Sequence, residues 1–166
     1  MHFDVDEIVE VALLSASGWE DVLASVPNVL IESSHPWWTC SPCRAHDCVV
    51  FVNVDGTTIY SGNYVMSDRI GIRPVFRVRP RTTNILLPGT KVTVGAFDGV
   101  IINDIRMQKF TNQECYDVLC STVTIKHSFD SETNEFYNSE IKEYINSPAF
   151  LKGIKHGIFD NSNGWI

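Results

Sequence analysis

Three cysteines and one histidine stand close together and carry side chains that bind transition metals. They have the spacing C-x2-C-x2-H-x-C, as Cys40, Cys43, His46 and Cys48. Zinc takes four such ligands tetrahedrally, so the number of ligands is right. The spacing fits no common zinc module, and Cys43 would need a sharp chain reversal to join the others. We expect free thiols, with no metal and no other cofactor; zinc or copper binding and redox catalysis are the alternatives.

Two adjacent tryptophans, Trp37 and Trp38, are candidates for ligand binding. In an extended segment, neighbouring side chains point to opposite faces. One ring would then anchor the core, and the other could form an exposed platform for a sugar ring or a protein partner. The alternative is that both rings are in the core, because tryptophan is usually well buried.

Five arginines crowd one short stretch, and they are Arg69, Arg73, Arg77, Arg79 and Arg81. One hypothesis is a surface for an anion or an acidic partner, with Arg69, Arg77 and Arg79 as its ligand-binding residues. The other, which the overall acidity favours, is a solvated strand face whose arginine stems cover apolar surface.

Arg73 differs from its neighbours because it stands between Gly71 and Pro74. We expect Arg73 to make buried structural hydrogen bonds rather than to contact a ligand. Gly71, Pro74 and Gly56 are predicted to be structural as well.

The common catalytic motifs are missing from the sequence. It has no G-x-S-x-G, no H-E-x-x-H, no P-loop and no G-x-G-x-x-G, so we expect no enzyme and no catalytic residue. Asp160, Asn161 and Asn163 could ligate calcium, but a polar terminal tail explains them more simply.

Composition narrows the classes of partner. The chain has 166 residues, 44% of them hydrophobic, and a net charge of −7. This size suits one domain, and the acidity argues against nucleic acid and against anionic membranes. No apolar run approaches the ~20 residues that cross a bilayer, so membrane insertion is not expected. An acidic start and five cysteines favour synthesis in the cytoplasm without a signal peptide, with a virion as one final location.

Hydrophobic patterning predicts a chain of short elements. We expect a strand over 8–15, then a helix with a capping box from Ser17 to Glu20. Asp55-Gly56 predicts a two-residue hairpin turn with positive φ at both positions, and a further turn is expected at 61–63. The other expected elements are strands at 49–52, 57–60, 64–66, 70–78, 91–95 and 118–125, and helices capped by Asn138 or Ser139 and by Ser147 with Pro148.

Four segments resemble an uncharacterised bacterial and phage domain family with Trp-Trp-Leu-Arg-Ser-Pro, Asp-Gly and Gly-Val-Arg-Pro-Ala motifs. They are Trp37-Trp38-Thr39-Cys40-Ser41-Pro42, Val52-Asn53-Val54-Asp55-Gly56, Ser61-Gly62-Asn63-Tyr64-Val65 and Gly71-Ile72-Arg73-Pro74. The family's ending is similar to that of formylglycine-generating-type domains. The resemblance implies an α+β, C-type-lectin-like fold: a twisted, mostly antiparallel sheet with two or three helices and long loops.

The matching segments stand in an unusual order. Residues 137–146 look like the family helix that precedes its Leu-Leu-Ser strand, but here they follow Gly71-Ile72-Arg73-Pro74. We infer a circular permutation, which predicts one domain over 1–166 whose halves, 1–79 and 91–166, are joined by a connection at 80–90. The last helices should pack beside 13–15, and 91–95 should lie near 71–78.

The predicted function is a non-enzymatic binding or decoration module. The family's phage members suggest a virion surface or host-attachment component that recognises a surface glycan or protein. The calcium motifs of sugar-binding C-type lectins are absent, so the fold alone does not imply sugar binding. The alternatives are a structural assembly protein held by partner chains, through self-association or other proteins, and a cysteine-dependent metal protein.

Overall fold

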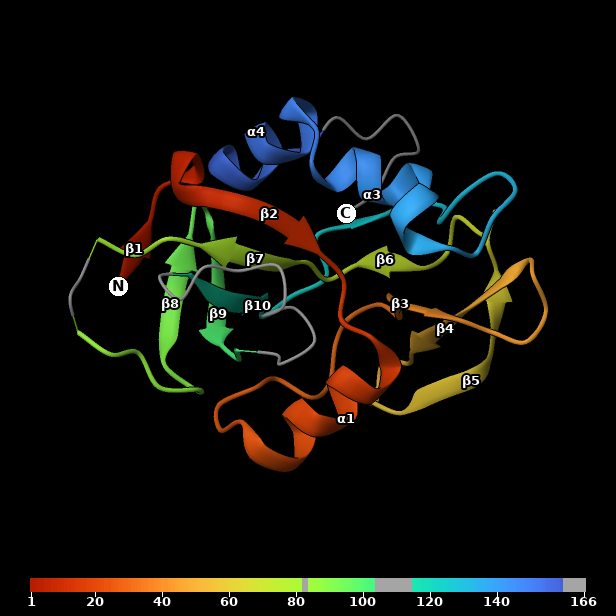
Figure 1. The fold of residues 1–166 in the computed structure, drawn as a ribbon, viewed down its shortest axis with the longest axis horizontal. Helices are drawn as coiled ribbons and strands as arrows, with labels where there is room; N and C mark the ends of the chain where they lie inside the picture. Colours follow the sequence, from red (N-terminus) through yellow and green to blue (C-terminus); the bar gives the residue numbers. More distant parts are fainter. Residues whose placement is uncertain (82–83, 104–114, 160–166) are drawn as a thin grey trace.

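The structure is a computed structural model that describes residues 1–81, 84–103 and 115–159. These residues form two β-sheets and three α-helices, which confirms the α+β class (Figure 1). Two strand pairs, β1 with β8 and β3 with β6, are parallel, and the other pairs are antiparallel, as expected.

The large sheet has six strands in the order β1-β8-β9-β10-β7-β2. Its strands are β1 (His2–Phe3), β2 (Ile8–Ala12), β7 (Val75–Val78), β8 (Lys91–Val94), β9 (Phe97–Ile101) and β10 (Tyr116–Cys120). The small sheet has five strands in the order β11-β6-β3-β4-β5. They are β3 (Trp37–Pro42), β4 (Cys48–Val52), β5 (Thr58–Tyr64), β6 (Gly71–Ile72) and β11 (Ile125–Lys126). Each sheet therefore takes strands from both halves of the chain.

Two neighbouring segments pass from one sheet to the other. The strand predicted over 70–78 is divided into β6 of the small sheet and β7 of the large sheet, with Arg73 and Pro74 between them. The strand predicted over 118–125 is likewise divided into β10 and β11. Because β7 pairs with β10 and β6 with β11, the two segments cross between the sheets side by side.

The α-helices lie on two opposite sides of the molecule. In Figure 1, α3 (Glu140–Ile145) and α4 (Pro148–His156) lie at the top, and α1 (Ala16–Ser25) lies at the opposite side, where it contacts β3 and β4 of the small sheet. Two 3₁₀ turns, η1 (Val5–Glu7) and η2 (Phe136–Asn138), complete the helical segments.

Serine hydroxyls cap the three α-helices. Ser139 accepts from the Lys142 N–H, and Ser147 accepts from the Phe150 N–H with Pro148 in the first turn, as predicted. The capping box at Ser17 is wrong. The helix begins at Ala16, two residues earlier than a cap at Ser17 would place it, because Ser15 accepts a hydrogen bond from the Gly18 N–H.

The hairpin between β4 and β5 lies where Asp55-Gly56 predicts it, but its geometry differs. The Gly56 N–H donates to Asn53 O at 2.9 Å, and the Asn53 N–H donates to Thr57 O at 2.8 Å. Gly56 has φ +87°, whereas Asp55 has a negative φ, so the two-residue turn with two positive φ values is wrong. The second turn, expected at 61–63, is wrong as well, because β5 continues through these residues to Tyr64.

Two hydrophobic clusters fill the interior. The helix-covered core lies under α3 and α4 and includes Trp38, Phe76, Ile141 and Phe150. The tryptophan core lies on the α1 side and consists of Leu14, Trp19, Val22, Trp37, Val52, Val75, Val100, Ile102, Leu119 and Val123.

The predicted neighbours of the permuted segments are partly correct. Helix α3 does pack against β2, and the side-chain amide of Asn146 both donates to Val11 O and accepts from the Val11 N–H, each at 2.9 Å. Strand β8 is in the same sheet as β7, but β9 and β10 lie between them. The expectation that 91–95 lie near 71–78 therefore holds only in that both contribute strands to the large sheet, because β10 and not β8 pairs with β7.

Candidate functional site

The two adjacent tryptophans do not form a platform. Trp37 and Trp38 point to opposite faces of β3, as predicted, Trp37 into the tryptophan core and Trp38 into the helix-covered core. Both are 0% exposed, so the expectation of an exposed ligand-binding ring is wrong. The reason is that β3 is an inner strand of the small sheet, and each of its two faces packs against one of the two cores.

Arg73 has the structural role that the sequence predicts. It is 1% exposed at the point where β6 passes into β7, and it donates from Nε to Cys120 O at 2.7 Å and from Nη2 to Leu30 O at 2.9 Å. Its guanidinium also lies 5.2 Å from the ring centroids of both Trp19 and Trp37. Arg73 thus connects the point where the chain passes between the two sheets to the segment that follows α1. Gly71 and Pro74 are buried beside it.

Arg77 is also buried, so its assignment as a ligand-binding residue and the expectation of a solvated strand face are both wrong. It lies between Asp117 of β10 and Glu10 of β2, which are its cross-strand neighbours in the large sheet. Its Nε is 3.1 Å from Asp117 Oδ1, and its Nη1 is 3.7 Å from Glu10 Oε2. A buried guanidinium needs such a charged partner.

Arg69 and Arg79 are exposed, but the structure does not bring them together. Arg69 precedes β6 of the small sheet, and Arg79 follows β7 of the large sheet. With Arg73 and Arg77 buried, the stretch does not present one continuous cationic surface.

The cysteine loop, residues 40–48, comprises the end of β3, the turn that follows it and the first residue of β4. In residues 1–81, 84–103 and 115–159, no group of three or more histidine, cysteine or acidic side chains is arranged to hold a metal. Cys40 packs against the helix-covered core, while His46 is exposed at the tip of the loop. Asp160, Asn161 and Asn163, the possible calcium ligands, lie outside the described residues.

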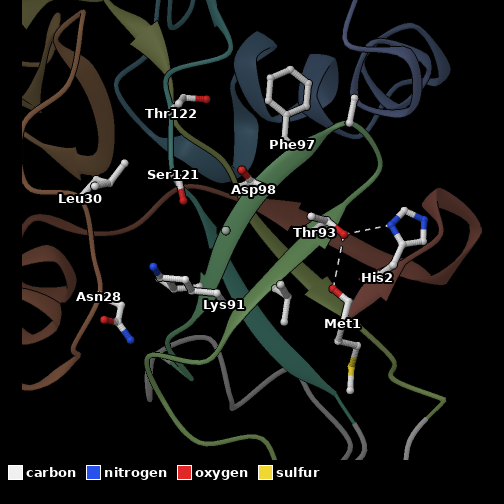
Figure 2. Close-up of a pocket in the computed structure, with 14 residues that line it drawn as sticks. Met1, His2, Asn28, Leu30, Lys91, Thr93, Phe97, Asp98, Ser121 and Thr122 are labelled. Atoms are coloured by element: carbon white, nitrogen blue, oxygen red, sulfur yellow. Dashed lines mark hydrogen bonds between the residues drawn. The ribbon is translucent and has the colours of Figure 1, made fainter.

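A groove with a volume of about 770 Å³ lies over β8 and β9 (Figure 2). In the register of these strands, Lys91 lies opposite Val100 and Thr93 lies opposite Asp98. Side chains directly opposite each other share a face of the sheet. These four residues therefore form the floor of the groove.

The walls of the groove come from other parts of the chain. On one side, His2 Nδ1 lies 3.0 Å from Thr93 Oγ1, and the Thr93 N–H donates to Met1 O at 2.9 Å. Figure 2 shows Asn28 and Leu30 facing Lys91 from the other side, and Ser121 and Thr122 closing the end near Asp98. Asn28 is fixed by its bond from Nδ2 to Gly89 O at 3.0 Å.

The groove exists because the two faces of the large sheet are covered unequally. On the α1 side, the tryptophan core extends over β7, β10 and β9, where it ends at Val100 and Ile102. Lys91 and Thr93 of β8 lie beyond it, so this part of the sheet remains open and polar. The alternation Lys91-Val92-Thr93-Val94 is the sequence signal that could have indicated this outward polar face.

None of the described helices has the length and apolar character required to cross a bilayer. In comparisons with protein-family models, with curated proteins and with solved structures, the chain matches none.

Proposed function

We propose that the chain is a non-enzymatic binding module that recognises a neutral, polyhydroxylated ligand, such as a surface glycan, in the groove over β8 and β9. The observation that carries this proposal is the balanced lining of the groove. Lys91 and Asp98 have opposite charges, while Thr93, Ser121 and Thr122 supply hydroxyls that both donate and accept hydrogen bonds. Leu30 adds an exposed apolar wall against which a sugar ring can pack.

The size of the groove supports the same proposal. Its volume of about 770 Å³ is within the range of small-molecule sites, which combine apolar walls with a few placed polar groups. A strongly anionic ligand would require a surplus of basic side chains, whereas here Lys91 is balanced by Asp98, and His2 lies against Asp4.

We also propose that the fold is a circularly permuted C-type-lectin-like domain, in which loops are presented on a rigid scaffold. The three helices, the mostly antiparallel sheets and the packing of α3 against β2 support this assignment. A decoration or attachment component of a particle surface is the setting that suits such a module.

Binding of the fluorescently labelled full chain to a glycan array tests the proposed function, followed by titration of the best ligand. Lys91→Ala and Asp98→Ala change exposed side chains of the groove floor, and each should weaken binding about tenfold, equivalent to one lost charged hydrogen bond. Arg69→Ala, which changes an exposed side chain outside the groove, is the matched control. Equal binding by all three variants, or no bound glycan, would contradict the proposal.

A structural assembly role is the second candidate, and it rests on a different observation. Leu30, Ile31 and Val54 are 54%, 50% and 41% exposed, and the chain around Ile31 lies against the β4–β5 hairpin, where the Ser33 N–H donates to Val54 O. Such apolar side chains could pack against a second copy of this chain. Sedimentation at several concentrations would then show a dimer that Ile31→Asp dissociates, whereas a monomer throughout would exclude this role.

A further inference from the structure

Two of the free cysteines face each other across the end of the β3–β4 hairpin. Pro42 pairs with Val49 in this hairpin, so the next pair outward is Cys43 and Cys48. The Cys43 N–H donates to Cys48 O at 3.0 Å, which confirms that the pairing continues. Residues that are directly opposite in an antiparallel pair have Cα atoms about 4.5–5.5 Å apart. Disulfides form across the same range of separations.

Both sulfur atoms are directed to the same face of the small sheet. Gly62 of β5 has φ +71°, and a Cβ there would lie 2.0 Å from Cys43 Sγ, so the sulfur occupies the space above this glycine. Cys48 lies opposite Cys43 in the hairpin, and directly opposite side chains share a face of the sheet. Burial first, and then the nearby Cys48 and Asp47, raise the pKa of Cys43.

The backbone between the two cysteines is already held in a closed turn. The side-chain amide of Asn134 donates to three carbonyls of this loop, Ala45 O at 3.0 Å, Cys48 O at 3.2 Å and Cys43 O at 3.4 Å. The Cys48 N–H donates to Ala45 O at 3.2 Å. Arg44, Ala45 and His46 at the tip are exposed, so a small reagent can reach the loop.

We propose that Cys43 and Cys48 form a dithiol that a small-molecule disulfide such as oxidised glutathione converts into an intramolecular disulfide. One cysteine thiolate attacks a glutathione sulfur, the glutathione S–S bond breaks, and one glutathione thiolate leaves. The second cysteine thiolate attacks the mixed disulfide and releases the other glutathione. The two cysteine protons end on the two glutathione thiols, so two cysteines are oxidised and one glutathione disulfide is reduced.

The other cysteines are not placed for this reaction. The Cys40 N–H donates to Leu14 O, and its side chain packs against the helix-covered core. Cys120 is 0% exposed at the end of β10, and Cys115 immediately precedes the same strand in the large sheet. The dithiol is therefore confined to the small sheet and is independent of the groove over β8 and β9.

Peptide mapping tests this proposal sharply because Arg44 stands between the two cysteines. The reduced full chain is incubated with oxidised glutathione, the remaining thiols are alkylated, and trypsin cleaves after Arg44. Before alkylation, the intact mass of the oxidised chain should be about 2 Da lower than that of the reduced chain, because two thiol hydrogens are lost. The tryptic peptides that contain Cys43 and Cys48 should remain joined until a reductant is added.

Two variants separate the pair from its neighbours. Cys43→Ser should stop at a glutathione adduct on Cys48, because the second thiol is missing, whereas Cys40→Ala should still form the disulfide. Separate glutathione adducts on Cys43 and Cys48 in the unchanged chain, a disulfide that includes Cys40, or no reaction at all would each overturn the proposal.

Discussion

At the scale of single residues, a guanidinium removed from water needs acceptors inside the protein. Arg73 has two carbonyl acceptors and two aromatic faces, and although desolvation lowers its pKa to about 10, it remains charged at neutral pH. Arg73→Leu would leave Cys120 O and Leu30 O without this donor. We expect the free energy of unfolding to fall by about 3 kcal/mol, measured by urea denaturation.

The exposed Arg69 supplies the control for this measurement. Arg69→Leu should change the free energy of unfolding by no more than about 0.5 kcal/mol, as is usual for surface substitutions. Equal effects at Arg69 and Arg73 would show that the two carbonyl contacts do not stabilise the sheet crossing.

The thiols of the cysteine loop should be slow nucleophiles at neutral pH. Burial and Asp47 raise the pKa of both Cys43 and Cys48, and the thiolate is the reactive form. Their alkylation by iodoacetamide should therefore accelerate at higher pH than that of a free thiol such as glutathione. Asp47→Asn removes the acidic neighbour and should shift both rate profiles to lower pH.

Peptide-resolved alkylation rates measure this effect. Asp98→Asn removes an acidic side chain from the large sheet and should leave the pH profiles of Cys43 and Cys48 alkylation unaltered. Profiles that Asp47→Asn does not move would mean that the carboxylate does not act on these thiols.

The same loop should not contain a metal. Among the described residues, no third ligand lies with the cysteines in a metal-binding arrangement. Protein purified without added metal should contain no stoichiometric zinc or copper by elemental analysis, and a chelator should leave its melting temperature unchanged. About one metal per chain, lost together with structure, would contradict this, because a structural zinc contributes to folding.

Local sequence predicted some of these roles and could not predict others. The position of Arg73 between Gly71 and Pro74 indicated a structural arginine, and the adjacency of Trp37 and Trp38 indicated opposite faces. The burial of Arg77 depends on Asp117, whose strand is distant in sequence. The groove likewise combines residues from four separate segments, so no local pattern defines it.

At the scale of elements, the β4–β5 hairpin depends on one glycine. Gly56 has φ +87°, and a Cβ there would lie 2.4 Å from Ile31 Cγ2. Its carbonyl also accepts a hydrogen bond from Trp19 Nε1 at 2.9 Å, which links α1 to the hairpin. Gly56→Val should destabilise the fold by at least ~1 kcal/mol, because a β-branched residue is strained at positive φ.

Thermal melting measures this loss, with Val54→Thr at an exposed position of the same turn as the control. The control should melt close to the unchanged chain. An unchanged melting temperature for Gly56→Val would show that the turn tolerates a side chain at this φ.

The sequence predicted the type of an element where the signals are local. It did not predict the boundaries that depend on tertiary structure. The serine caps and Pro148 marked α3 and α4 correctly. The strands predicted over 70–78 and 118–125 are each divided between two sheets, since their hydrophobic patterns continue across the crossing. In β9, Asp98-Gly99 is a dipeptide typical of turns, yet it lies within a strand paired on both sides.

At the scale of the whole molecule, the two halves should not fold separately. Both sheets contain strands from residues 1–79 and from residues 91–159, and Leu86 of the connection is buried in the helix-covered core. Separately produced fragments 1–79 and 91–166 should each lack cooperative unfolding by circular dichroism and recover it only when mixed. A fragment that melts cooperatively alone would contradict this expectation.

The swapped order of the resembling segments predicted the contact of α3 with β2 but not the position of β8. A resemblance predicts spatial neighbours only for the segments that it covers. Residues 97–101, which form β9, matched no segment of the family and were not predicted as a strand. Strands β9 and β10 stand between β8 and β7; a strand over 118–125 was predicted, but its position in the sheet was not.

The side chain of Asn146 has a consequence for how this protein behaves at high concentration. Strand β2 is the last strand of the large sheet, and open strand edges invite edge-to-edge polymerisation. The Asn146 amide takes both hydrogen-bonding groups of Val11, the donor and the acceptor that an incoming strand would need. At Val11, one side chain therefore makes the hydrogen bonds that a further strand would make, and we expect it to oppose the addition of another chain along this edge.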